Sequence, residues 1–233
     1  RTAARARVTR GQQETAPAPV SARPGGPAPA AKGSEQPEGL VIIGVSTGGP
    51  KSLEQIIPRL PGDFPHPVVI AQHIGESFTR LLAERLDQMS AVTVREVSRP
   101  TPLVPGEVVL GRGDRDITLG RRGEQLVALN LPPDNEGYLW HPSVDRLVWS
   151  ALELFRPESI IGVQLTGMGR DGAEALRAVH AGGGRTVAES EETAVVYGMP
   201  RELVELGGAS AVQPLDRVAD QVLRWTEEGV PCL

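Results

Sequence analysis

Short, uninterrupted apolar runs alternate with helical patterns along most of the chain, and this alternation limits the fold more than any other feature. Clear examples of such runs are residues 40–45 (LVIIGV), 68–71 (VVIA) and 160–165 (IIGVQL). A run without polar alternation is typical of a strand that is buried on both faces. Strands separated by helices predict an α/β fold, a doubly wound and mostly parallel sheet with helices on both faces.

The remaining patterns supply further elements around these strands. Ser77 is expected to cap a helix whose apolar stripe holds Phe78, Leu81, Leu82, Leu86 and Met89. Other helices are expected at residues 50–60, 143–156, 172–181, 200–206 and 215–228, and other strands at 92–97, 185–189 and 210–213. Residues 107–130 break the alternation. Their three apolar runs (VVL, DITL and QLVAL) flank turns and predict an inserted antiparallel ribbon.

The first 38 residues differ from the rest of the chain. They contain six prolines and no aromatic residue. Such a segment buries too little apolar surface to offset the entropy lost on ordering. We therefore expect residues 1–38 to be a disordered linker or tail, and residues 39–233 to form one folded domain. Because the chain begins with Arg1 rather than Met, it is interpreted as a segment of a longer protein.

Charge and cysteine content exclude several functional classes. The net charge of −5 argues against nucleic acid and anionic membranes as partners, because either would favour a basic face. No apolar run approaches the roughly 18 residues that a membrane span needs. The only cysteine, Cys232, excludes an internal disulfide framework and a zinc site built from cysteines. These features predict a cytoplasmic protein.

Polar residues with complementary chemistry follow three of the predicted strands. Ser46 follows the first strand, His73 follows the second, and Asp171 lies in the loop after residues 160–165. Ligands of an open parallel sheet bind beyond the carboxyl ends of its strands, where these loops meet. A hydroxyl, an imidazole and a carboxylate at one edge are the groups of nucleophilic acyl transfer.

The chemistry explains why each residue type is needed. A serine hydroxyl attacks only when a base takes its proton, and histidine, with an unperturbed pKa of ~6.5, does so at neutral pH. A carboxylate on the other ring nitrogen fixes the tautomer. Gly44-Val45-Ser46-Thr47-Gly48 matches the nucleophile-elbow pattern, and backbone N–H groups starting with that of Thr47 are suited to hold an oxyanion.

Each of these residues also has a structural interpretation. Ser46 is suited to cap a helix, His73 to lie on the surface, and Asp171 to cap the helix at 172–181. Their joint occurrence at three strand ends favours catalysis over the three separate explanations. His141 enters a predicted helix and remains a competitor for the base. His66 and His180 are discounted because one lies at the wrong strand end and the other within a helix.

Three other motifs fail on spacing or order. A phosphate-binding loop requires lysine directly after its second glycine, but Pro50 separates Gly49 from Lys51. A dinucleotide fingerprint requires glycine where Ser46 stands. An α/β-hydrolase would place its histidine after its acid. No cluster of two histidines and an acid with metal spacing is present, so we expect neither a metal nor a cofactor.

Five segments together resemble the catalytic domain of chemotaxis receptor methylesterases, the CheB family. The segments are residues 41–50 (VIIGVSTGGP), 72–73 with 78–80 (QH and FTR), 142–145 (PSVD), 165–173 (LTGMGRDGA) and 198–201 (GMPR). The resemblance runs from about Leu40 to Trp225. One segment alone would be weak support, but the combination is highly specific.

The resemblance implies a serine hydrolase that acts in chemosensory adaptation. The expected reaction is hydrolysis of glutamate γ-methyl esters on methyl-accepting chemotaxis receptors, which releases methanol; deamidation of receptor glutamines is a second expected activity. The nucleophile of the family falls on Ser46, its base on His73 and its carboxylate on Asp171. Thr47 and Met168 lie where the oxyanion-stabilising backbone of the family would be.

Two departures and two alternatives accompany this interpretation. The family usually has arginine where His141 stands, and its hairpin differs from residues 111–116 of this chain. The family also has an N-terminal receiver domain, for which residues 1–38 are too short, so such a domain is expected upstream or regulation differs. The alternatives are a non-catalytic signalling module that docks through the arginine-rich ribbon, and a serine esterase for small molecules.

Overall fold

The computed structural model describes residues 36–133 and 137–229. Most of the predicted disordered tail, residues 1–35, lies outside the described residues, as does Cys232.

A seven-stranded sheet forms the centre of the domain, and all of its neighbouring strands are parallel. The strand order is β10-β9-β8-β1-β2-β5-β3. The strands are β1 (Leu40–Val45), β2 (Val68–Gln72), β3 (Thr93–Glu96), β5 (Glu107–Leu110), β8 (Ile160–Gln164), β9 (Arg185–Glu189) and β10 (Ala211–Gln213). This sheet confirms the predicted doubly wound α/β fold. The chain extends from the central β1 to one side first and returns to the other side at β8, so the strand order reverses at β1.

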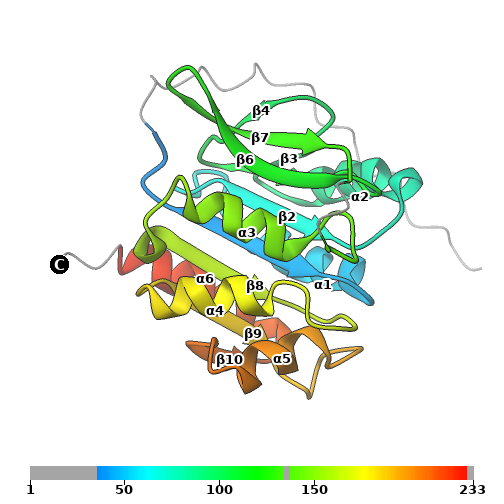
Figure 1. The fold of residues 1–233 in the computed structure, drawn as a ribbon, viewed down its shortest axis with the longest axis vertical. Helices are drawn as coiled ribbons and strands as arrows, with labels where there is room; N and C mark the ends of the chain where they lie inside the picture. The colour runs from blue at the N-terminus through cyan, green and yellow to red at the C-terminus, as the bar shows by residue number, and fades with distance from the viewer. Residues whose placement is uncertain (1–35, 134–136, 230–233) are drawn as a thin grey trace, which may run out of the picture. The chain divides into compact units, whose positions relative to one another are not determined.

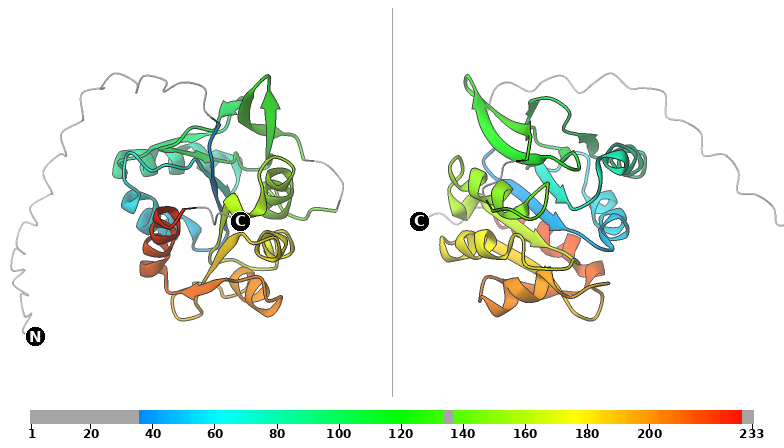
Figure 2. Two further views of the ribbon diagram at one scale, coloured as in Figure 1. Left: turned by 90° about the vertical axis from the view of Figure 1, so that its left-hand side faces the viewer. Right: turned by 45° about the vertical axis from the view of Figure 1, so that its right-hand side comes forward.

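Helices cover both faces of the sheet (Figures 1 and 2). One face packs against α1 (Gly49–Ile56), α2 (Glu76–Met89) and α6 (Leu215–Glu227), and the other against α3 (Val144–Leu152), α4 (Ala173–Ala181) and α5 (Met199–Glu205). Short 3₁₀ helices follow α1 at Ile57–Arg59 and precede β8 at Pro157–Ser159. Every residue of β1 is buried, and its side chains alternate between two hydrophobic cores. Burial on both faces explains why this strand is an unbroken apolar run.

The inserted ribbon is present, but it is smaller than the sequence predicted. It consists of β6 (Asp116–Arg122) and β7 (Gln125–Leu131), with the two-residue β4 (Thr101–Pro102) paired to β7. The run at Glu107–Leu110, predicted as part of the ribbon, is instead β5 of the main sheet. It pairs in parallel with β2 and β3. The prediction was wrong because a short apolar run does not itself show which strand it will pair with.

The predicted apolar stripe of α2 was right only in part, because Leu82 and Leu86 are buried but three other members are not. The buried residues of α2 are Thr79, Leu82, Ala83 and Leu86, whereas Phe78, Leu81 and Met89 are exposed. The N-cap of the helix is Gly75, two residues before the predicted cap Ser77. Residues 79, 82, 83 and 86 still follow the spacing of one helix face. The sequence interpretation favoured the largest side chains, and so it included three residues that lie off this face and missed Thr79 and Ala83.

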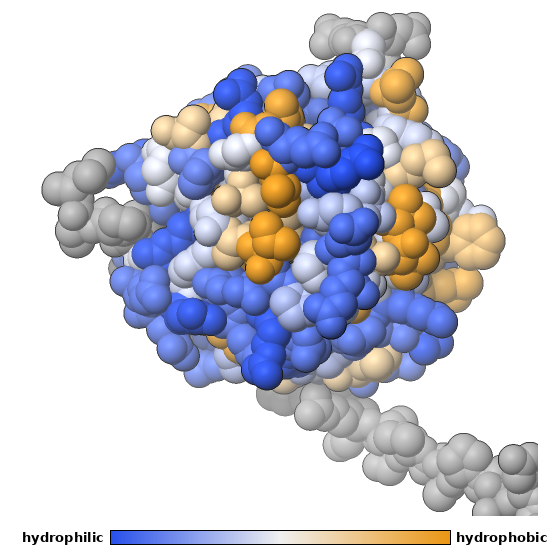
Figure 3. Space-filling view, turned by 90° about the horizontal axis from the view of Figure 1, so that it is seen from below, coloured by the Kyte–Doolittle hydropathy of each residue, from blue (hydrophilic) through white to orange (hydrophobic). Residues whose placement is uncertain are grey.

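The surface seen in Figure 3 is mostly hydrophilic, with hydrophobic residues gathered in a few small patches. Among the described helices, none combines the length and the apolar character needed to cross a bilayer.

Candidate active site

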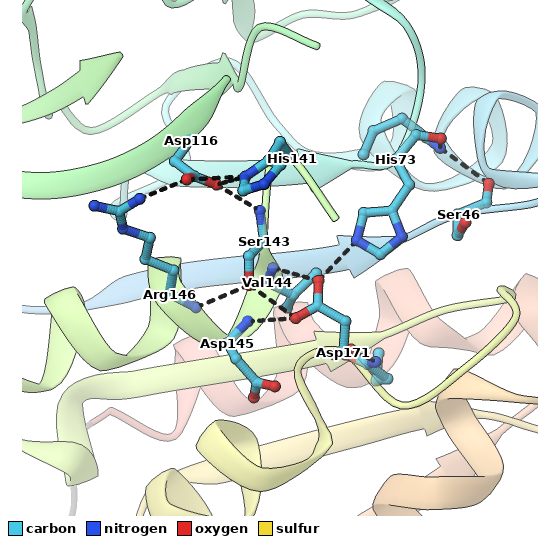
Figure 4. A network of polar contacts seen from close by, with 11 residues as sticks. Ser46, His73, Asp116, His141, Ser143, Val144, Asp145, Arg146 and Asp171 are labelled. Atoms are coloured by element: carbon cyan, nitrogen blue, oxygen red, sulfur yellow. Dashed lines mark hydrogen bonds and ion pairs between the residues drawn. The ribbon is translucent and has the colours of Figure 1, made fainter. Parts of the chain in front are cut away.

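The three predicted site residues lie at one edge of the main sheet. Ser46 directly follows β1, His73 directly follows β2, and Asp171 lies in the loop between β8 and α4. Because β1 pairs with both β2 and β8, the carboxyl ends of these strands are adjacent. Figure 4 shows the imidazole of His73 between Asp171 and Ser46. The structure therefore brings together three side chains that are far apart in the sequence, at the reversal of strand order where such sheets bind ligands.

His73 and Asp171 are joined by a short hydrogen bond in a buried setting. The Nε2 atom of His73 lies 2.8 Å from Oδ2 of Asp171, and the His73 side chain is only 4% exposed. A carboxylate at Nε2 favours the tautomer that carries its proton there. In that tautomer Nδ1 is an acceptor, available to take a proton from a neighbouring hydroxyl.

The Asp171 carboxylate is held by the N-terminus of α3 as well as by His73. It accepts hydrogen bonds from Ser143 Oγ at 2.9 Å, Val144 N at 2.7 Å and Asp145 N at 3.1 Å. Burial alone would raise the pKa of Asp171, but these hydrogen bonds and the one to His73 outweigh burial and lower the pKa. Asp171 is thus kept ionised. It caps α3, whereas the structural interpretation of the sequence placed it as a cap of the helix at 172–181; the residue before that helix is Gly172.

The Nδ1 atom of His73 is buried and has no hydrogen-bond partner within residues 36–133 and 137–229. Buried polar atoms are almost always paired, so an exception calls for an explanation. Ser46 and His73 line the same cleft, which has a volume of about 560 Å³. An unpaired acceptor beside a serine in a cleft is suited to activate the hydroxyl.

The turn that carries Ser46 is shaped by a glycine and anchored to the β8 loop. Ser46 N donates to Thr166 O at 2.9 Å. Gly48 has a φ of +88°, a conformation that glycine adopts without strain, and α1 begins at the next residue. Thr47 and Met168 both line the cleft. Neither of their N–H groups donates to another backbone group in the described chain, so both fit the predicted oxyanion role.

Two buried glutamines support the site, and the sequence interpretation assigned a role to neither. Gln72, the last residue of β2, donates through Nε2 to Ser46 O at 2.9 Å and to His73 O at 3.1 Å. Gln164, the last residue of β8, donates to Asp171 O at 2.7 Å. Both glutamines therefore fix the backbone of predicted site residues. Their only signal in the sequence is a polar residue at the end of a strand that is otherwise apolar.

His141, the predicted competitor for the base, lies in the cleft wall but has a different partner. Its Nδ1 is 3.0 Å from both carboxylate oxygens of Asp116. Asp116 is fully buried and also accepts hydrogen bonds from Ser143 N at 3.1 Å and from the Arg146 guanidinium. This second histidine–carboxylate pair joins β6 to the start of α3, and no hydrogen bond connects it directly to His73.

Asp145 completes the network behind the site. Its carboxylate caps α4 by accepting from Ala175 N at 3.0 Å, while its own N–H donates to Asp171. Burial raises the pKa of Asp145 from an ordinary 3.8 to about 6, and the charge of Asp171 adds to this effect, although the Ala175 hydrogen bond opposes it. Asp171, from the loop before α4, thus binds the N-terminus of α3, and Asp145, from the first turn of α3, binds the N-terminus of α4.

The other histidines lie elsewhere. His180 is within α4 and pairs with Ser210, and His66 precedes β2, at the opposite end of the strand from His73. In the part of the chain that the structure describes, no three His, Cys, Asp or Glu side chains gather in a way suited to hold a metal ion.

Comparisons with known proteins show the family and the fold of the chain. A family model described as CheB methylesterase matches residues 41–222. The chain belongs to the CheB methylesterase family. The crystal structure of the CheB methylesterase catalytic domain of Thermotoga maritima is 38% identical in sequence and matches the fold with a TM-score of 0.75, over 80% of this chain and 97% of that one.

Relatives of this CheB family member carry the name protein-glutamate methylesterase/protein-glutamine glutaminase. One from Rhodopseudomonas palustris is 49% identical over 211 residues, which cover 91% of this chain and 57% of that protein. One from Rhodospirillum rubrum is 51% identical over 187 residues, which cover 80% of this chain and 50% of that protein. The chain thus spans about half the length of the curated relatives it matches. The resemblance stated from the sequence motifs is confirmed at the level of family and fold.

Proposed function

We propose that this chain hydrolyses glutamate γ-methyl esters on methyl-accepting chemotaxis receptors, with Ser46 as nucleophile, His73 as general base and Asp171 as the carboxylate that orients it. One observation carries the proposal. A buried His73–Asp171 hydrogen bond leaves the second imidazole nitrogen without a partner in the cleft that Ser46 also lines. The substrate class comes from the names of the relatives.

The proposed reaction follows the arrangement of the site. Ser46 Oγ attacks the γ-carbonyl carbon of the ester while its proton passes to Nδ1 of His73. The tetrahedral oxyanion is received by the backbone N–H groups of Thr47 and Met168. Collapse breaks the bond to the methoxy group, which leaves as methanol with the proton from His73. A water molecule then hydrolyses the acyl-enzyme by the same steps, which restores Ser46 and leaves glutamate.

Asp171 contributes by stabilising the imidazolium that forms during each half of the reaction. Its ionised state is favoured by three donors besides His73. A receptor glutamine would react in the same way, with ammonia leaving in place of methanol. Deamidation is therefore the proposed second activity, in keeping with the glutaminase in the relatives' names. The cytoplasm is the proposed compartment, and an upstream receiver domain remains a prediction.

The test is methanol release from methylated receptor, with mass spectrometry of the receptor after incubation. Ser46→Ala is expected to abolish release. Ser90→Ala is the matched control, because Ser90 is a serine of equal exposure at the end of α2, away from the cleft. It is expected to leave release unchanged.

The same experiment separates the alternatives. Activity on a generic ester but not on receptor would favour a small-molecule esterase. A wild-type protein inactive on both substrates would favour the non-catalytic module. Mass loss at esterified glutamates would show the esterase activity, and conversion of glutamines to glutamates would show the deamidase activity.

A further inference from the structure

An indole ring covers one face of the His73 imidazole. The ring centroids of Trp140 and His73 are 5.2 Å apart, and the ring planes are inclined by only 10°. This is a stacked arrangement within the range of favourable aromatic pairs. Trp140 also lines the cleft, and its Nε1 lies beside Gly169, next to Met168. The indole thus lies between the predicted base and the loop that carries a predicted oxyanion donor.

The position of Trp140 is fixed by the residues that follow it. His141 O accepts a hydrogen bond from Asp114 N at 3.1 Å. The His141 ring and Ser143 N are both held by the fully buried Asp116. The second histidine–carboxylate pair therefore anchors the segment that places the indole against His73, although it makes no direct contact with the predicted base.

The stack has a consequence for the proposed reaction. His73 becomes positively charged when it takes the proton from Ser46, and the face of an indole attracts a cation within about 6 Å. The attraction is stronger for the imidazolium than for the neutral ring, so it favours the transition state over the ground state. The covering indole also limits rotation of the imidazole, which must hold Nε2 on Asp171 and Nδ1 toward Ser46.

We propose that Trp140 is a positioning residue of the hydrolysis, which holds the His73 ring in its reactive orientation and stabilises the imidazolium through the face of the indole. This proposal rests on the proposed function, because it acts through the base assigned there. Trp149 provides the matched comparison. It is exposed to the same extent as Trp140, 42%, but lies on α3 and stacks on no other ring in the described part of the chain.

The kinetic test compares Trp140→Leu, Trp140→Phe and Trp149→Leu on methylated receptor. Trp140→Leu is expected to lower kcat about 10-fold with little change in KM, because the cation–π contact to the buried His73 ring is lost. Trp140→Phe keeps an aromatic face and is expected to recover most of kcat. Trp149→Leu is expected to match the wild type. An unchanged kcat in Trp140→Leu, or an effect on KM alone, would overturn the proposal.

A second measurement tests the stack without any substrate. A protonated imidazole in contact with an indole quenches its fluorescence, so the emission of the wild-type protein is expected to fall as the pH is lowered. The fall is expected to disappear in both Trp140→Phe and His73→Gln. The other titratable groups of the cleft and its network are Asp114, Asp116, His141, Asp145 and Asp171. Quenching of Trp140 that persists in His73→Gln would come from one of these other groups and would contradict the stack.

The two measurements keep the proposals apart. A wild-type protein that releases no methanol overturns the proposed function and the role of Trp140 with it. An active wild type whose Trp140→Leu variant has the same kcat overturns only the role of Trp140.

Discussion

Two buried carboxylates, Asp171 and Asp116, bind the N-terminal segment of α3, and each is also bonded to a histidine that lines the cleft. Their other partners differ. Asp116 forms an ion pair with the Arg146 guanidinium, whereas the donors to Asp171 besides His73 are uncharged. The histidines differ too, because the free nitrogen of His73 is buried in the cleft that Ser46 lines. The comparison suggests a rule for the proposed mechanism: a histidine–carboxylate pair acts in catalysis only where its second ring nitrogen is unpaired and a nucleophile lines the same cleft.

Asp171→Asn is expected to have the largest effect on the reaction. An amide at this position no longer fixes the His73 tautomer or stabilises its charge, so kcat should fall about 10⁴-fold. Methanol release from methylated receptor measures this effect, and circular dichroism checks that the fold is kept. A folded variant with wild-type turnover would remove Asp171 from the mechanism.

Asp116→Asn is expected to act on stability instead. The substitution removes the buried carboxylate that binds His141, the Arg146 guanidinium and Ser143 N, which should lower the free energy of unfolding by about 3 kcal/mol. The kcat of the folded variant should stay within about 10-fold of the wild type, because the His73–Asp171 hydrogen bond is kept and only the anchoring of the segment that carries Trp140 is weakened. Denaturant unfolding and methanol release measure the two effects. Unchanged stability with a collapsed kcat would reverse the roles assigned to the two carboxylates.

Asp145 predicts a pH dependence of stability. Its pKa in the folded protein is about 6, above the ordinary 3.8. The folded state therefore retains a proton that the unfolded chain releases, and the stability contributed by this group is lost as the pH rises through about 6.

Asp145→Asn should consequently raise the free energy of unfolding at pH 8 by about 2 kcal/mol relative to the wild type, with little gain at pH 4. Thermal unfolding at the two pH values measures the difference. Asp63→Asn, at an exposed position, is the control. An equal gain at both pH values would show that the ionisation of Asp145 is not its cause.

Gln72→Met is expected to have the smallest effect. The variant keeps the side-chain volume but loses the donor to the Ser46 and His73 carbonyls, so kcat should fall about 10-fold. Gln213→Met, at the edge strand β10, should leave kcat unchanged, although Gln213 also donates a hydrogen bond. Equal effects of the two substitutions would indicate general destabilisation rather than loss of positioning.

The sequence was a good guide wherever local pattern and topology coincide. The buried run at 40–45 predicts β1, because burial on both faces leaves a direct trace in residue type. The helix expected at 143–156 is present as α3, although it ends already at Leu152. The meeting of Ser46, His73 and Asp171 follows from their places after parallel strands. Strand pairing was harder to predict from the sequence, because no local feature of residues 107–110 shows that they pair with β2 and β3.

The supporting residues of the site were harder to predict from sequence. The contact of Trp140 with His73 and the bonds of Gln72 depend on side-chain directions in a loop and at a strand end. The α2 stripe was predicted only in part, because Thr79, a polar residue, is buried while Phe78 is 58% exposed. The buried Thr79 hydroxyl donates to Glu76 O at 3.1 Å, a compensation that hydrophobicity alone does not reveal.

The central claim is that Ser46 and His73 act as one unit, and a double-mutant comparison tests it most directly. Methanol release from methylated receptor would be measured for Ser46→Ala, His73→Gln and the double variant. When two residues act as a unit, removing either one abolishes almost all of the enzyme's activity. The double variant is therefore predicted to be no slower than the slower single variant. Losses that multiply in the double variant would show two independent contributions and would contradict the account.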